Sequence, residues 1–158
     1  MYLTPLEVST FQRTIWEFYS KNKRSFPWRE TVDPYRIVVS EVMLQQTQTY
    51  RVQPKYERFI KQLPTFESLA AAPLQQVLEL WQGLGYNRRA IALKRIAEIV
   101  VNTHLGKLPS SIEALDELPG IGHATACSIC AFAFNSPVVF IETNIRRVFI
   151  HSFFSRKK

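Results

Sequence analysis

Most of the chain alternates between segments whose apolar side chains recur every three or four residues and short breaks rich in glycine, proline and serine. This spacing is that of one face of an α-helix. Segments of this kind begin near residues 5, 34, 50, 65, 73, 88, 111, 124 and 143, and none shows the convincing alternation of a strand. The sequence therefore predicts an all-α protein.

One carboxylate interrupts the most apolar segment. Residues 34–44 follow the capping pair Asp33-Pro34 and are nearly all apolar, so they should form a central, buried helix. Glu41 lies within it, and Gln45-Gln46-Thr47-Gln48 follows. Burial of an unpaired carboxylate is costly and raises its pKa towards values useful for proton donation, while glutamines can read base edges. Alternatively, Glu41 faces solvent beside Arg36.

Residues 115–126 read as two short helices joined by a hairpin that contains Leu118-Pro119-Gly120-Ile121-Gly122. Pro119 should stop the first helix, and Gly120 and Gly122 should adopt backbone conformations that other residues resist. Bare N–H groups and the positive end of the next helix dipole would then suit a phosphate. An ordinary turn between helices is the alternative.

Aromatic and charged residues also gather at other helix ends. The loop before residue 34 presents Trp28 and Arg29, although Trp28 would also suit a core anchor. A second glycine turn, residues 83–86, precedes Arg88-Arg89, whose charges oppose the dipole of the helix that they open and so hint at a partner. A solvated face would explain either arginine alone. Glu142 precedes the last helix, where capping is the alternative.

The composition favours an anionic partner. The 158 residues include 20 Lys and Arg against 13 Asp and Glu, a net charge of +7, which suits nucleic acid or a membrane surface. We see no secretory signal and no apolar run long enough to span a bilayer, so we expect one cytoplasmic domain. Cys127 and Cys130 lie one turn apart in an apolar segment and read as core residues rather than metal ligands.

Five stretches together resemble the helix-hairpin-helix (HhH-GPD) DNA glycosylase superfamily, and the chain is most similar to its MutY-type adenine glycosylases. They are residues 26–29, 34–35, 40–48, 83–86 and 118–126. The resemblance implies a single domain, 1–158, with a six-helix barrel at about 30–135 that contains the hairpin at 115–126. Residues 1–29 and 136–158 would be the remnant of an incomplete second helical subdomain.

The resemblance also implies residue roles. Glu41 matches the family's catalytic glutamate, which protonates adenine at N7, and Glu142 stands where the family has an aspartate that stabilises the cationic sugar. Gln46 matches the residue that wedges into the base stack. The implied pocket and wedge residues are Trp28, Arg29, Leu44, Gln45, Gln46, Thr47, Leu84, Tyr86 and Asn144. The implied phosphate-binding residues are Leu118, Gly120, Ile121, Gly122, His123 and Thr125.

Three departures from the family pattern qualify this reading. Glu142 replaces the aspartate, and Ala124 stands where endonuclease III-type relatives carry a Schiff-base lysine, so we expect no lyase activity. Full-length relatives add a four-cysteine iron–sulfur cluster and a domain that recognises oxidised guanine. We expect neither here, because two cysteines cannot supply a four-thiolate cluster and the sequence is truncated relative to those relatives. Phe153 and Phe154 should therefore be exposed, and the chain would be a fragment, a degenerate copy or half of a split protein.

The sequence thus predicts a monofunctional DNA glycosylase of base excision repair without a cofactor. Its partner would be double-stranded DNA that carries adenine opposite guanine or 8-oxoguanine. A thymine or uracil mismatch glycosylase is the alternative on substrate. A DNA-binding module that has lost turnover is the alternative outside the enzymes, and a partner chain could supply the missing C-terminal half.

Overall fold

The computed structural model describes residues 3–154, in which the regular structure is entirely helical. The expected all-α class is confirmed. The elements are α1 (Pro5–Asn22), the 3-10 turn η1 (Pro27–Arg29), α2 (Pro34–Leu44), α3 (Thr49–Gln62), α4 (Phe66–Ala71), α5 (Leu74–Trp81), α6 (Arg88–Thr103), α7 (Ile112–Asp116), α8 (His123–Phe134), α9 (Thr143–Phe149) and the π-helical turn η2 (Ile150–Phe154).

The chain divides into two compact units. The larger one, here called the barrel unit, is Phe26–Phe140, and the smaller one, the terminal unit, is Met1–Ser25 with Ile141–Lys158. The range of about 30–135, over which the sequence predicts a six-helix barrel, falls inside the barrel unit.

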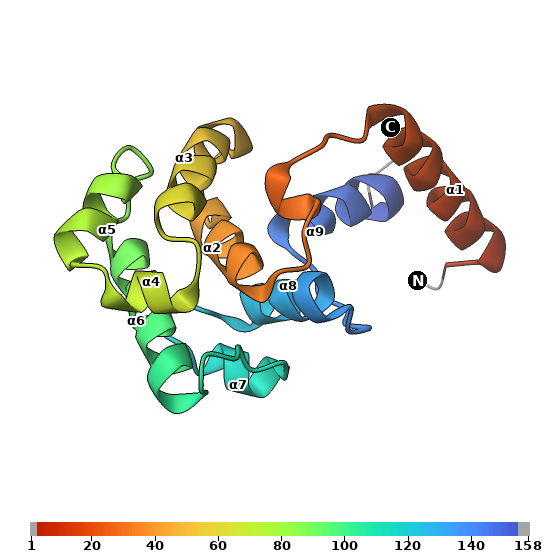
Figure 1. The fold of residues 1–158 in the computed structure, drawn as a ribbon. Coiled ribbons are helices and arrows are strands. Elements are labelled where there is room, and N and C mark those ends of the chain that lie inside the picture. Colours follow the sequence, from red (N-terminus) through yellow and green to blue (C-terminus); the bar gives the residue numbers. More distant parts are fainter. Residues whose placement is uncertain (1–2, 155–158) are drawn as a thin grey trace. The chain divides into compact units, whose positions relative to one another are not determined.

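Helix α2 is the central element of the barrel unit. It contacts α3, α6 and α8, and Figure 1 shows it flanked by α3 and α8. The Asp33 side chain caps its first turn by accepting hydrogen bonds from the amides of Tyr35 and Arg36. Every residue from Ile37 to Met43 is buried. The prediction of a central, buried helix is therefore confirmed, and it places Glu41 inside the core.

The terminal unit has little core of its own. Thr4 and Glu7 form a capping box at the start of α1, but α1 buries no residue, and Trp16 and Phe18 are each 66% exposed. The ring of Phe153 packs 4.8 Å from that of Phe11, so Phe153 is half-buried and not exposed as expected. Phe154 is 65% exposed, in agreement with the prediction.

Candidate functional site

Glu41 is a buried carboxylate that carries an ion pair. Its side chain is 9% exposed, and its Oε1 accepts hydrogen bonds from both Nη1 and Nη2 of Arg29, each at 3.1 Å. Glu41 therefore does not face solvent beside Arg36, which forms an exposed ion pair with Asp33 at 4.0 Å. The guanidinium stabilises the charge of a carboxylate that burial would otherwise disfavour.

Arg29 is itself held by an aromatic ring. Its guanidinium carbon lies 3.8 Å from the ring centroid of Phe132 on α8, within the range of a cation–π contact. Sequence reasoning did not single out Phe132, because nothing local distinguishes it from a core phenylalanine of an apolar helix. The pair of contacts fixes the guanidinium between α8 and the carboxylate of α2.

Trp28 is a core side chain in this structure. It is 1% exposed, stacks on Phe26 with centroids 5.1 Å apart and meets the edge of Tyr56 at 5.4 Å. Its neighbours anchor the η1 turn to the barrel unit and so set the position of Arg29. A role for Trp28 in the wall of a base pocket stays a prediction.

The last residue of α2 and the four residues that follow it form a loop, 44–48, that is connected to the hairpin. Gln45 Nε2 donates to the carbonyl of Gly120 at 3.0 Å and lies 3.4 Å from Thr125 Oγ1. Gln46 is exposed and has φ +53°, a left-handed conformation that is unusual for a residue other than glycine. Leu44 and Thr47 beside it are half-buried. The loop therefore presents Gln46 outward while Gln45 ties it to residues 120–125.

The second glycine turn, residues 83–87, lies against the same loop. Leu84 is buried, whereas Tyr86 is 57% exposed and also left-handed, with φ +49°. Both loops contact Arg89, the second residue of α6, which is only 7% exposed. The sequence suggested either an external partner or a solvated face for the arginine pair. For Arg89 neither suggestion holds, because its guanidinium is buried against the two loops.

Helices α7 and α8 form the expected hairpin, but its two glycines differ. Gly120 has φ +79°, and a Cβ there would meet the Cβ of Ala92 at 3.0 Å, so any other residue would be strained. Gly122 has φ −107°, open to any residue, and a Cβ there would meet nothing within 4 Å. The prediction of a special conformation at Gly122 was wrong. The space beside Gly122 is open, so a ligand can approach the backbone there closely.

The hairpin ends in an uncapped helix. Gly122 is the N-cap of α8 and offers no side chain, so the amides of the first turn have no intrahelical or capping partner. Leu118 and Ile121 are buried and anchor the turn, while His123 is exposed and Thr125 is half-buried. The arrangement can bind an anion through N–H groups and the helix dipole.

Glu142 and Asn144 lie in the terminal unit, at the start of α9. Glu142 is the N-cap of α9, but its side chain makes no capping hydrogen bond. Both side chains are exposed. Capping therefore does not account for the carboxylate of Glu142.

The two cysteines lie close together on α8. Cys127 and Cys130 are both buried in α8, and Cys130 Sγ contacts the carbonyl of Ser110 at 3.4 Å. Burial raises the pKa of the Cys130 thiol. Over residues 3–154, no group of three or more His, Cys, Asp or Glu side chains is placed to hold a metal ion.

Helices long and apolar enough to cross a membrane are likewise absent from this part of the chain.

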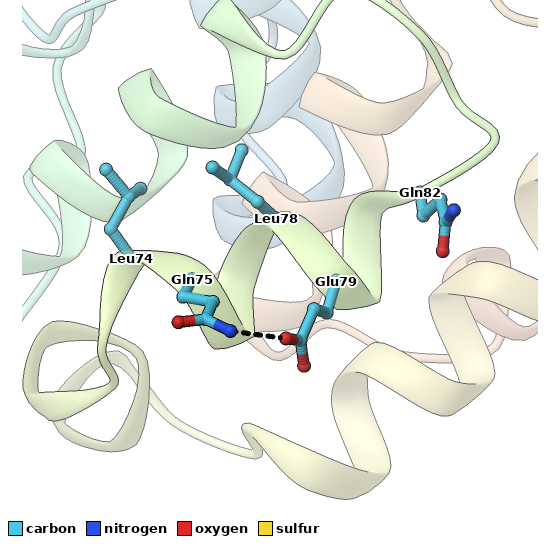
Figure 2. Close-up of a pocket in the computed structure, with 5 residues that line it drawn as sticks. All are labelled: Leu74, Gln75, Leu78, Glu79 and Gln82. Atoms are coloured by element: carbon cyan, nitrogen blue, oxygen red, sulfur yellow. Dashed lines mark hydrogen bonds between the residues drawn. The ribbon is translucent and has the colours of Figure 1, made fainter.

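A separate shallow pocket lies along α5 (Figure 2). Its lining residues are Leu74, Gln75, Leu78, Glu79 and Gln82. Its one carboxylate, on Glu79, accepts a hydrogen bond from Gln75 Nε2 at 3.0 Å along the same helix. None of the residues singled out in the sequence lines it, and it offers no group poised for chemistry.

Comparison with known proteins gives a family match and named relatives. Residues 39–158 match the model of the HhH-GPD superfamily of base excision DNA repair proteins. The chain is 40% identical over 141 residues to a protein of Buchnera aphidicola named adenine DNA glycosylase. The aligned region covers 89% of this chain and 40% of that protein. It is 32% identical over 139 residues to a Methanothermobacter thermautotrophicus protein named thymine/uracil-DNA glycosylase, over 87% of this chain and 63% of that protein.

The fold also matches a solved structure. The structure of a thermostable thymine-DNA glycosylase superposes with a TM-score of 0.84 at 31% identity and covers 90% of this chain and 66% of that one. The chain therefore spans less than half the length of the adenine glycosylase that it matches and about two thirds of the thymine glycosylase structure.

Proposed function

The chain belongs to the HhH-GPD superfamily of base excision DNA repair proteins, and we propose that it is a monofunctional DNA glycosylase that removes adenine opposite guanine or 8-oxoguanine. The observation that carries this proposal is the setting of Glu41. Burial of a carboxylate in the central helix costs free energy of desolvation, even when Arg29 pairs with it. We take this cost as a sign that the carboxylate serves a function. It lies three residues before the start of a loop that connects to the hairpin through Gln45 and Gly120.

In this proposal Glu41 is the general acid. The ion pair with Arg29 favours the ionised carboxylate, so Glu41 first takes up a proton from solvent. The protonated carboxyl group then donates this proton to N7 of the extruded adenine, so that the C1′–N9 bond breaks with its electron pair leaving on a neutral base. The positive charge that develops on the sugar is stabilised by a carboxylate, the role proposed for Glu142. The ionised Glu41 then accepts a proton from the water that attacks C1′. These steps use only protein side chains and water.

The same proposal assigns the DNA contacts. The amides of the hairpin, at Gly120, Gly122 and the first turn of α8, would bind a phosphate oxygen and fix the register of the duplex. Gln46 and Tyr86, both exposed on tight loops, would fill the space that the extruded base leaves. The net charge of +7 supports double-stranded DNA as the partner, and such a protein would act in the cytoplasm, at the nucleoid in a prokaryote.

Thymine or uracil is the second candidate substrate. Two proteins named for thymine favour it, at 31% and 32% sequence identity. The chain covers 63% and 66% of their lengths, compared with 40% of the Buchnera aphidicola adenine glycosylase. A DNA-binding module without turnover is the third candidate. Glu142, in place of the family's aspartate, is the residue on which that alternative depends, since it carries the charge one methylene further from the backbone.

The test is single-turnover base release from duplexes with adenine, thymine or uracil opposite guanine or 8-oxoguanine. Release of adenine supports the first candidate, and release of a pyrimidine supports the second. Tight, salt-sensitive binding with no release from any duplex would refute both and leave the DNA-binding module.

A further inference from the structure

Two residues on neighbouring loops of the barrel unit hold an unfavourable backbone conformation. Gln46 in loop 44–48 has φ +53°, and Tyr86 in loop 83–87 has φ +49°. Left-handed residues other than glycine and asparagine are rare, and they persist only where the surroundings impose them. Both side chains are exposed, so neither conformation is explained by burial of the side chain itself.

One buried guanidinium holds both loops. Nη1 of Arg89 donates to the carbonyls of Val42, at 3.1 Å, and Met43, at 3.0 Å, and to that of Gln45. Nη2 donates to Thr47 Oγ1 at 3.0 Å and to the carbonyls of Leu84 and Gly85 at 3.3 Å each. The contacts flank Gln46 on both sides and precede Tyr86 directly, and the Tyr86 ring lies 5.4 Å from the guanidinium carbon.

The charge of Arg89 is balanced by backbone dipoles. Among residues 3–154, no carboxylate forms an ion pair with it, and burial lowers its pKa. Its acceptors include the last carbonyls of α2, where the helix dipole is negative and the chain has no intrahelical donors left. If either loop moved, the buried guanidinium would lose part of this compensation, so Arg89 couples the positions of the two loops.

We propose that Arg89 is a positioning residue for base extrusion: it holds loops 44–48 and 83–87 in one arrangement, so that Gln46 and Tyr86 enter the duplex together. This inference rests on the proposed function. Arg89 touches neither the base nor the reacting atoms. Its loss slows the opening of a paired base and leaves cleavage of an already unpaired base nearly unchanged.

The experiment compares Arg89→Lys with the native chain. Lysine keeps the charge but cannot reach both loops with a planar fork. Arg95→Lys is the matched control, because Arg95 is an exposed arginine on the same helix, α6. Single-turnover base release is measured on the duplex that the native chain cleaves, and on the same duplex with the opposing nucleotide replaced by a tetrahydrofuran abasic analogue, so that the target base has no partner.

We expect Arg89→Lys to slow release from the paired duplex by about tenfold or more, and from the unpaired one by about twofold or less, because extrusion of a paired base is the costlier step. Arg95→Lys should leave both rates within about twofold of the native values. Amide hydrogen exchange of the free protein should accelerate about tenfold in both loops and stay unchanged in α8.

Equal slowing on the two duplexes, or exchange that accelerates in one loop only, would overturn the proposal. Absence of release by the native chain from either duplex would overturn the proposed function and this inference together, whereas release with equal slowing overturns the inference alone. If Arg89→Lys does not fold, Thr47→Val replaces it. Valine has nearly the shape of threonine and removes the acceptor of Nη2, so the same split between duplexes should appear at a smaller size.

Discussion

Replacement of Arg29 by methionine tests the ion pair on which the setting of Glu41 depends. Methionine keeps an unbranched apolar stem against Phe132 but removes both N–H groups that contact Glu41 Oε1 at 3.1 Å. Removal of one partner from a fully buried pair costs about 3–5 kcal/mol. Arg29 is 34% exposed, so solvent screens part of the interaction, and we expect a loss of about 1–2 kcal/mol in the free energy of unfolding.

The assay is urea unfolding at pH 7, followed by circular dichroism. Arg36→Met is the matched control, because Arg36 forms an exposed pair with Asp33 at 4.0 Å and should change stability by less than about 0.5 kcal/mol. The double variant Arg29→Met/Glu41→Gln should be more stable than Arg29→Met alone, because it no longer buries a carboxylate without its guanidinium. A loss for Arg29→Met no larger than that of the control, or no recovery in the double variant, would refute the reasoning.

Three further predictions follow from single residues. The hydroxyl of Tyr56 is buried without a hydrogen-bond partner among the described residues, and burial raises its pKa to about 12. Because the unfolded chain ionises near pH 10 and the folded one does not, stability should fall by up to about 2 kcal/mol as the pH rises from 10 to 12, and Tyr56→Phe should flatten that fall in urea titrations. Gly120→Ala should cost about 1–2 kcal/mol, because of its positive φ and the approach of Ala92, whereas Gly122→Ala should cost less than about 0.5 kcal/mol; equal losses in thermal unfolding would contradict the geometry. Borohydride added during base release should trap no covalent complex, since Ala124 offers no amine, and a trapped complex would show that another residue forms a Schiff base.

Helix positions were predictable because their signals are local. Asp33-Pro34 marks the start of α2, and the apolar run that follows it predicted a buried helix. Burial of Glu41 within that helix was one of the two alternatives that the sequence left open. The left-handed glycine at position 120 was equally visible, because the turn between α7 and α8 needs a residue without a Cβ. In these cases the physical cause lies within a few residues of its effect.

The contacts of Arg89 and Arg29 were not predictable, because their partners are distant in sequence. Arg89 binds carbonyls more than forty residues earlier in the chain, and backbone acceptors carry no sequence signature. The one available signal was that Arg89 opposes the dipole of α6, the helix to which it belongs. In the structure its charge compensates the dipole of α2 instead. Helical periodicity in α1 likewise identified an apolar face but not what covers it, and Trp16 and Phe18 are exposed.

The role of Glu41 as general acid is the central claim, and Glu41→Gln tests it most directly. Glutamine keeps the size of the side chain and cannot donate a carboxyl proton. Single-turnover release on the duplex that the native chain cleaves best should fall at least about a hundredfold in this variant, with binding of the same duplex retained. Release within a few-fold of the native rate would contradict the account, because the proton would then come from another group.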